Sequence, residues 1–205
     1  MPDFQVVDPT NTATDALDAA ARAAKAHEGV APKTGASLNR HKSESTVVTP
    51  MVFVDACEAR YGCIRMDLAA TKENSRRGSS SCYTVEDDAF SKDWAADLQG
   101  DVGWLNPPYN DIGAWAKKAD VEAGKGARVV MLVPASVGSN WYRDYIHFKH
   151  PVDFINGRIM FDGHDQPYPK DLMVVLFGFA AVLGRVTPNV WTVPRNCLRS
   201  DTQKA

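Results

Sequence analysis

The chain has 205 residues, with 44% hydrophobic and 23% charged residues and a formal net charge of -2 at pH 7. This composition predicts one globular domain with its own core, and the small negative charge argues against binding to nucleic acid through charge alone. The sequence contains no apolar run near the roughly 20 residues that cross a membrane, and its polar start is unlike a secretion signal. We therefore predict a cytoplasmic protein that spans no membrane.

The cysteines and histidines do not have the spacing of a metal site. No CxxC pair occurs among the four cysteines, which are Cys57, Cys63, Cys82 and Cys197. We interpret them as reduced, buried thiols. His147 and His150 have too little support from other potential ligands to suggest zinc, so we predict no metal site.

Local patterns divide the chain into a weakly specified leader (1–45), a main domain (46–180) and a C-terminal extension (181–205). The main domain is predicted to open with a helix, because Thr49 is a suitable N-cap and Pro50 suits the first helical position. Gly62 is a natural stop for this helix. One face of the helix is apolar at helical spacing, with Phe53, Ala56, Cys57 and Tyr61.

Cys63 to Leu68 is predicted to be the first strand of a sheet, followed by Ala69 and Ala70. An acidic residue and small residues at a strand's carboxyl end let a ligand approach the backbone closely. Asp67 is therefore a candidate ligand contact, with a surface turn acid as the alternative. The polar segment 71–81 is predicted to be a loop near the mouth of this site, and it carries Arg76 and Arg77.

Val102 to Leu105 is predicted to be a short buried strand that stops before Pro107 and Pro108. Proline has no backbone N–H and a fixed φ, so two prolines cannot continue a central strand. The residues past Leu105 must form a rigid turn at the strand's carboxyl end, where ligands bind in open α/β sheets. With the Asn106 amide, free carbonyls and the ring of Tyr109, this turn is suited to grip a planar group that bears an NH₂.

The rest of the chain alternates between helix and strand patterns. Helical spacing marks Ile112, Trp115, Ala116 and Ala119, and a short helix is predicted from Asn140 to Phe148. Strands are predicted at Arg128–Val133, Val152–Ile155, Arg158–Phe161, Leu172–Phe177 and, at an edge, around Val190–Val193. This alternation predicts an open α/β sheet in which Asp67, Asp88 and Asn106 converge near strand carboxyl ends.

The sequence Asn106-Pro107-Pro108-Tyr109 resembles the Asn/Asp-Pro-Pro-Tyr motif of amino-group methyltransferases that use S-adenosylmethionine. Together with Asp88-Ala89-Phe90, Trp94, Trp104 and Trp115, the region from about Val47 to Gly178 resembles the small Dam-type DNA adenine methyltransferases of phages and prophages. The usual Gly-x-Gly loop is absent, and an Asp-x-Ala-Ala segment stands in its place, as in this phage branch. The resemblance implies an open, mostly parallel Rossmann-like methyltransferase sheet with helices on both faces and an antiparallel edge hairpin.

The resemblance also implies transfer of a methyl group from S-adenosylmethionine to the exocyclic amino group of adenine in DNA. The adenine must be flipped out or single-stranded to reach such a turn. The implied catalytic residues are Asn106, Pro107, Pro108 and Tyr109. The implied cofactor contacts are Thr46, Thr49, Pro50, Asp67, Leu68, Ala69, Asp88, Ala89 and Asn106. DNA contacts are predicted for Arg76, Arg77, Tyr109, Trp141 and Arg158.

Other functions stay open from the residues alone. Release-factor glutamine methyltransferases use a similar turn, since glutamine presents a comparable planar NH₂, and RNA adenine methylation is a nearby variant. The chain is also compatible with a catalytically silent binding module. For Asp88, the resemblance implies a contact with the cofactor's adenine amino group, and a helix-start acid is the alternative. Because the chain is short, we expect any DNA sequence readout to be brief, relaxed or shared across a homo-oligomer.

Overall fold

A computed structural model describes residues 48–71, 75 and 82–199, all within one compact unit that runs from Lys42 to Ala205. The predicted leader and three predicted site residues, Thr46, Arg76 and Arg77, lie outside the described residues. No helix in the described ranges is long and apolar enough to cross a membrane. The same ranges contain no group of three or more His, Cys, Asp or Glu side chains that could hold a metal ion.

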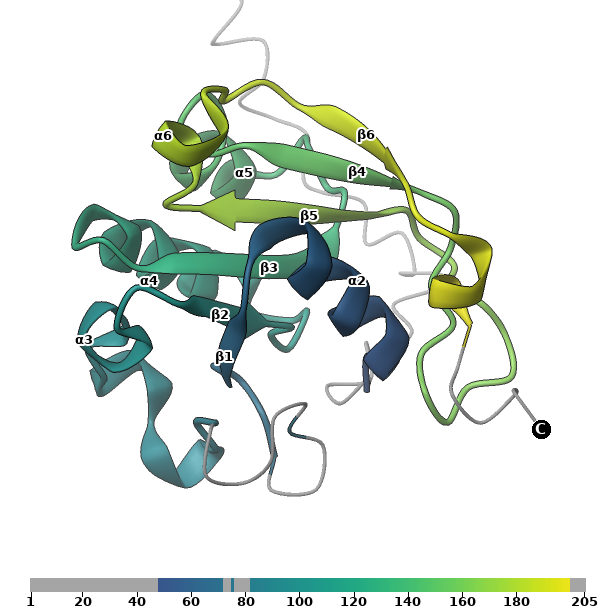
Figure 1. Ribbon diagram of the computed structural model, residues 1–205, viewed down its shortest axis with the longest axis horizontal. Helices are drawn as coiled ribbons and strands as arrows, with labels where there is room; N and C mark the ends of the chain where they lie inside the picture. The colour runs from purple at the N-terminus through teal and green to yellow at the C-terminus, as the bar shows by residue number, and fades with distance from the viewer. Residues whose placement is uncertain (1–47, 72–74, 76–81, 200–205) are drawn as a thin grey trace, which may run out of the picture. The chain divides into compact units, whose positions relative to one another are not determined.

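A six-stranded sheet in the order β1-β2-β3-β5-β4-β6 forms the centre of the fold (Figure 1). The strands are β1 (Ile64–Asp67), β2 (Val102–Leu105), β3 (Arg128–Pro134), β4 (Val152–Asn156), β5 (Leu172–Phe177) and β6 (Asn189–Thr192). Neighbouring strands are parallel except at β5, which is antiparallel to both β3 and β4. The predicted α/β sheet with an antiparallel pair is therefore confirmed, and β6 adds the edge strand that the sequence suggested beyond that pair.

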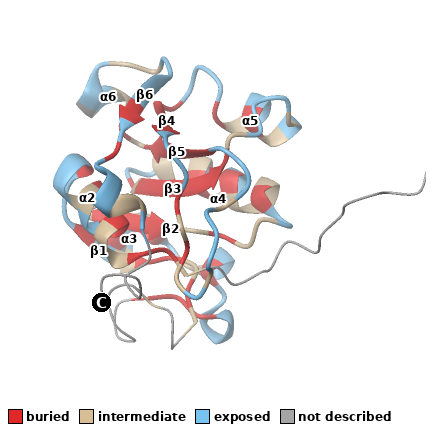
Figure 2. Ribbon diagram, turned by 90° about the vertical axis from the view of Figure 1, so that its right-hand side faces the viewer, coloured by how far each residue is buried: buried red, intermediate tan, exposed pale blue. Residues whose placement is uncertain are grey.

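Helices cover both faces of this sheet (Figures 1 and 2). They are α2 (Met51–Tyr61), α3 (Trp94–Leu98), α4 (Ile112–Gly124), α5 (Asn140–Tyr145) and α6 (Ala180–Leu183), with 3-10 turns η2 (Val85–Asp87), η3 (Ala89–Ser91) and η4 (Arg195–Leu198). On β3, Val129, Met131 and Val133 join one hydrophobic cluster with residues of α3, α4 and α5. Val130 and Leu132 join a second cluster with residues of α2. A strand buried on both faces explains the continuous apolar run at β3.

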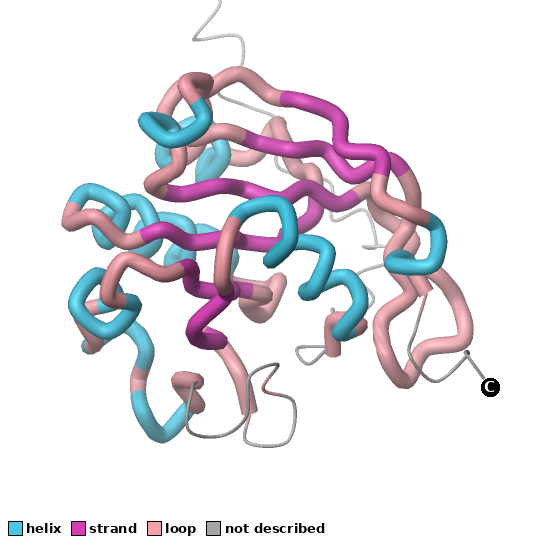
Figure 3. The backbone as a smooth tube through the Cα atoms, viewed as in Figure 1, coloured by secondary structure: helices cyan, strands magenta, loops and turns pink. Residues whose placement is uncertain are grey.

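The predicted strand Arg158–Phe161 is wrong, because the segment between β4 and β5 contains no strand (Figure 3). Gly157, with a φ of 125°, turns the chain directly after β4. Beyond it, the Ile159 carbonyl accepts a hydrogen bond from the N–H of Tyr168 (2.8 Å) instead of a strand partner. Ile159 and Phe161 are 0% and 2% exposed. Their alternating pattern therefore reflects side chains that are buried in the core, while the backbone of this segment does not pair with a strand of the sheet.

The predicted start of α2 needs a correction. The helix begins at Met51, with Pro50 at the N-cap, and the side chain of Pro50 makes no capping hydrogen bond. Thr49 is not the cap because its Oγ1 accepts a hydrogen bond from Asn106 Nδ2 (3.1 Å), 57 positions along the chain. The end of the helix at Gly62, which has a φ of 113°, is as predicted.

Two smaller predictions also differ from the structure. Helix α5 ends at Tyr145, before the predicted Phe148. Phe148 itself has a φ of 57°, a conformation that does not continue an α-helix. Cys57 and Cys82 are buried as predicted, but Cys197 is half-buried and Cys63, just before β1 at one end of the sheet order, is exposed.

Candidate active site

A cavity of about 440 Å³ lies where the carboxyl ends of β1 and β2 meet. The two strands are parallel, with Asp67 beside Trp104, and the N–H of Leu68 donates to the Trp104 carbonyl (2.8 Å). The cavity is lined by Val48, Thr49, Asp67, Leu68, Ala69, Ala70, Thr71, Tyr83, Thr84, Val85, Asp88, Ala89, Phe90, Trp104, Asn106, Pro107, Pro108, Tyr109 and Trp115. This volume and position are typical of a ligand site in an open α/β sheet.

The turn after β1 is held by the Asp67 carboxylate. Asp67 is 4% exposed, and its Oδ1 accepts a hydrogen bond from the Ala69 N–H (3.2 Å). Backbone bonds tie the turn to Tyr83, whose N–H donates to the Asp67 carbonyl (2.8 Å) and whose carbonyl accepts from the Ala70 N–H (3.0 Å). The three residues that we predicted to contact the cofactor here, Asp67, Leu68 and Ala69, all line the cavity.

Gly103 of β2 makes room for this turn. A Cβ atom at Gly103 would lie 2.6 Å from Leu68 Cδ1 and 3.2 Å from Leu98 Cδ1. The missing side chain therefore lets Leu68 pack directly on β2, where it is fully buried beneath the cavity.

The wall formed by Asp88, Ala89 and Phe90 follows the 3-10 turn η2. Thr84 caps this turn, because its N–H and Oγ1 both donate to Asp87 Oδ2 (2.8 Å each). Asp87 is thereby used in the cap, whereas Asp88 lines the cavity. Asp88 adopts the left-handed conformation (φ 50°), and its Oδ1 accepts from the N–H of Phe90 (3.2 Å). Asp88 follows a 3-10 turn instead of a strand, and it lines the cavity at the carboxyl ends of β1 and β2 together with Asp67 and Asn106.

The turn after β2 places Asn106 and Tyr109 against the cavity. Asn106 Nδ2 donates to Thr49 Oγ1, which orients the amide, and Thr49 is 2% exposed. The Tyr109 ring lies edge-on to Tyr168, with centroids 5.8 Å apart. The Tyr109 hydroxyl is buried and has no hydrogen-bond partner among the described residues. Burial, together with Tyr168, raises the pKa of Tyr109 well above its ordinary value, so this phenol is neutral at neutral pH.

Three other predicted site residues lie outside the cavity lining. Pro50 is the N-cap of α2. Trp141 is half-buried in α5 and packs beside α4, where a Cβ at Gly113 would lie 3.7 Å from Trp141 Cβ. Arg158 Nη1 donates to the Pro169 carbonyl (2.9 Å), so this arginine links the two ends of the loop between β4 and β5.

Sequence reasoning missed several residues of the site. Val48, Tyr83, Val85 and Trp104 were not proposed as site residues, yet they line the cavity. Tyr168, which contacts Tyr109, was missed as well, although an aromatic residue between two prolines in a polar loop is a usable signal. Val85, which is 87% exposed, had no signal in the sequence because its place depends on the turn at Thr84.

Two comparisons with known proteins agree on one family. The family model described as DNA N-6-adenine-methyltransferase (Dam) matches residues 37–173, a range that includes every residue lining the cavity. The chain is also similar to the DNA N-6-adenine-methyltransferase of Escherichia phage T1, with 29% identity over 96 residues, or 47% of this chain. The aligned part spans 38% of that relative's length.

Proposed function

This chain belongs to the DNA N-6-adenine-methyltransferase (Dam) family, and we propose that it transfers a methyl group from S-adenosylmethionine to the exocyclic amino group of adenine in DNA. The observation that carries the proposal is the cavity at the carboxyl ends of β1 and β2. Asp67, Asp88 and Asn106 come from three separate segments and line it together. Because the similar methyltransferase comes from a phage, the place of action that we propose is the cytoplasm of a host cell.

The residues that line the cavity support S-adenosylmethionine as the methyl donor. Two carboxylates, Asp67 and Asp88, offer acceptors for the N–H and O–H groups of a positively charged nucleoside. Ala89, Phe90 and Trp115 supply an apolar wall for its adenine ring. We assign Asp88 to the amino group of that ring, and we place Thr49 at the methionine end.

When bound, S-adenosylmethionine supplies an electrophilic methyl group on a sulfonium. The amino nitrogen of adenine is a poor nucleophile because its lone pair is delocalised into the ring. In the proposed mechanism, Asn106 Oδ1 and the Pro107 carbonyl each accept a hydrogen bond from one of the two N–H groups of this amino group. These contacts favour a tetrahedral nitrogen with a localised lone pair, aligned with the methyl group.

The side chains of Asn106 and Tyr109 do not accept the proton that the amino nitrogen releases. Asn106 is an amide, and the pKa of Tyr109 is raised by burial, so neither side chain takes a proton at neutral pH. Water takes the proton after transfer. The ring of Tyr109 stacks on an adenine that is flipped out of the duplex or single-stranded.

The proposal is tested by incubating the full chain and methyl-labelled S-adenosylmethionine with DNA, RNA and a glutamine-bearing release factor in parallel. We expect the label in N6-methyladenine after digestion of the DNA to nucleosides. Label in protein glutamine, or in RNA alone, would overturn the proposed acceptor. Tight cofactor binding without any transfer would instead identify a catalytically silent binding module.

Replacing Asp67 with asparagine should weaken S-adenosylmethionine binding about 2- to 30-fold. The asparagine keeps the acceptor for the Ala69 N–H, but its bond to the cofactor no longer involves a charged group, a difference of about 0.5–2 kcal/mol. Isothermal calorimetry measures the change in Kd. Asp101→Asn is the matched control, since Asp101 pairs with Arg65 away from the cavity. Equal affinity of the two variants for S-adenosylmethionine would show that Asp67 does not contact the cofactor.

A further inference from the structure

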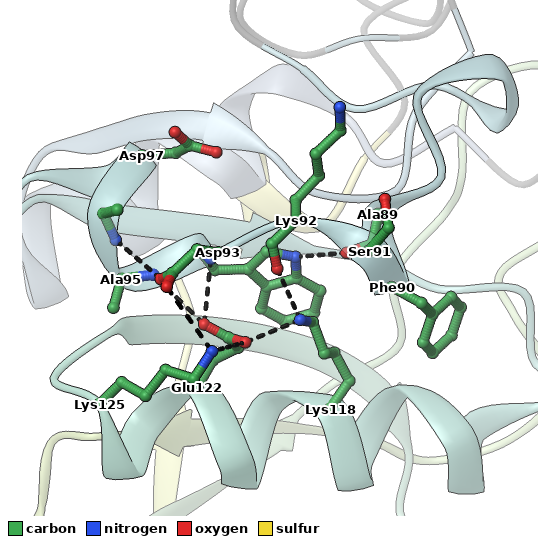
Figure 4. A network of polar contacts seen from close by, with 12 residues as sticks. Ala89, Phe90, Ser91, Lys92, Asp93, Ala95, Asp97, Lys118, Glu122 and Lys125 are labelled. Carbon is green, nitrogen blue, oxygen red and sulfur yellow. Dashed lines mark hydrogen bonds and ion pairs between the residues drawn. The ribbon is translucent and has the colours of Figure 1, made fainter.

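The last turn of α4 carries a carboxylate that is shielded from solvent. Glu122 is 0% exposed and lies at the centre of a polar network (Figure 4). Its Oε1 accepts hydrogen bonds from the Nζ atoms of Lys118 (2.7 Å) and Lys125 (2.9 Å). Its Oε2 accepts from the backbone N–H groups of Trp94 (3.0 Å) and Ala95 (3.4 Å). Glu122 therefore fastens the start of α3 to α4.

The charge on Glu122 is maintained by these partners. Burial acts to raise the pKa of Glu122, but the hydrogen bonds from Lys118 and Lys125 outweigh it and lower the pKa below its ordinary value. The carboxylate is thus ionised at neutral pH. A buried charge of this kind is stable only while its partners stay in place, so the network has one preferred arrangement.

Two hydrogen bonds and one cation–π contact extend the network from Glu122 to the cavity wall. Lys118 Nζ donates to the Lys92 carbonyl (2.6 Å) and lies 5.4 Å from the centre of the Trp94 ring. Trp94, which is fully buried, donates from its Nε1 to the Ala89 carbonyl (2.8 Å). Ala89 lines the cavity. Figure 4 shows the side chains of Lys118 and Glu122 pointing from α4 toward the segment that runs from Ala89 to Ala95.

The wall is built on a single short 3-10 turn. Residues 88–92 comprise η3 with its flanking residues Asp88 and Lys92, and they belong to no strand of the sheet. Asp88 adopts a left-handed conformation that is uncommon for a residue other than glycine. The Phe90 ring packs on Trp115 of α4, with centroids 4.5 Å apart, but Phe90 stays 42% exposed. The bonds at Lys92 and Ala89 are therefore important for the shape of the wall.

We infer that Glu122 and Lys118 are positioning residues that hold the wall of Asp88, Ala89 and Phe90 in the conformation that binds S-adenosylmethionine. The inference rests on the proposed function, because the wall is assigned to that cofactor. Neither Glu122 nor Lys118 lines the cavity, so both act through Lys92 and Trp94. Their role concerns affinity for the cofactor and leaves the transfer step, at Asn106, unaffected.

Glu122→Gln tests this inference in the full-length chain. The amide keeps the size of the side chain but turns one acceptor into a donor, which faces either a lysine or a backbone N–H. We expect Kd and KM for S-adenosylmethionine to rise about 5- to 30-fold. This is less than the roughly 10- to 150-fold that a hydrogen bond to a charged group contributes directly, because Glu122 acts on the wall through Lys92 and Trp94. The kcat at saturating cofactor should stay within about twofold. Lys118→Met, which removes the bond to Lys92, should give the same pattern and decides the matter if Glu122→Gln does not fold.

Asp153→Asn is the matched control. Asp153 is also 0% exposed, and it accepts hydrogen bonds from Tyr61 (2.7 Å), Arg60 (3.3 Å) and Arg185. None of these four residues lines the cavity. The control should lower the melting temperature without changing KM. An equal rise of KM in the control would reduce Glu122 to a general stabilising role and overturn the inference.

Hydrogen exchange gives a second readout that needs no turnover. Peptides covering 88–95 should exchange faster in Glu122→Gln than in the wild type, and should be unchanged in Asp153→Asn. If the wild type binds no S-adenosylmethionine, the proposed function fails. If the wild type binds it and Glu122→Gln binds it equally well, with unchanged exchange, only the positioning role fails.

Discussion

The Asn106→Ala variant is expected to lose methyl transfer about 10²- to 10³-fold while binding S-adenosylmethionine nearly as tightly as the wild type. The reason is that Asn106 is assigned to the amino group of the acceptor, where removal of one aligned hydrogen-bonding group typically costs this much in kcat. Single-turnover rates measure the transfer step, and calorimetry measures the affinity for the cofactor.

Two further variants separate the chemistry from the packing of the turn. Asn106→Asp keeps an acceptor oxygen but loses the Nδ2 donor to Thr49, and it reproduces the Asp-Pro-Pro-Tyr form of the motif. It should retain transfer within about tenfold, since the Thr49 hydroxyl can donate to the new carboxylate and so keep it oriented. Asn110→Ala, at an exposed position just past the turn, should behave like the wild type. Near-normal turnover of Asn106→Ala would remove the proposed mechanism.

The elements that the sequence predicted well depend on local rules. Val102–Leu105 and Leu172–Phe177 were predicted with the bounds that the structure has, because each is a short apolar run that is followed closely by a residue unfavourable in a strand, Pro107 or Gly178. The turn at Asn106 could be placed at the edge of the sheet for the same reason. Proline restricts the backbone wherever it occurs, whatever lies around it.

The features that the sequence did not predict depend on contacts between distant residues. Thr49 satisfies the rule for an N-cap, yet its hydroxyl is bonded to Asn106. The contact with Asn106, distant in the sequence, takes the place of the local capping bond that the rule predicts. Arg158–Phe161 has the alternation of a strand, but burial of Ile159 and Phe161 produces that alternation without strand pairing. Periodicity reports burial, and it does not identify the backbone partner.

The sequence around Glu122 contains a signal for a buried ion pair that the prediction did not include. It lies three positions after Ala119, on the apolar face of α4 that Ile112, Ala116 and Ala119 define. An acidic residue on such a face has to be paired if it is buried, and Lys118 stands four positions earlier. The pattern therefore predicts a buried ion pair. What it cannot predict is that the pair also bonds to Lys92 and Trp94, because those contacts depend on how α3 packs.

The Tyr109 ring should matter for turnover, while its hydroxyl should not. Base–aromatic stacking contributes about 1–3 kcal/mol, so Tyr109→Ala should lower kcat/KM roughly 5- to 150-fold. Tyr109→Phe should keep kcat/KM close to the wild-type value. Because the hydroxyl is buried without a partner among the described residues, its removal should leave the melting temperature unchanged or raise it.

Tyr109→Leu separates stacking from packing. Leucine retains most of the contact with Tyr168 and with both hydrophobic clusters, where Tyr109 is a partly buried member, but it has no π-face. We expect it to melt closer to the wild type than Tyr109→Ala does, and to be as slow in transfer. Steady-state kinetics on DNA and thermal unfolding of the three variants provide the comparison. If Tyr109→Leu were as active as Tyr109→Phe, stacking would play no part, and an acceptor without a ring, such as glutamine, would fit the site better than adenine.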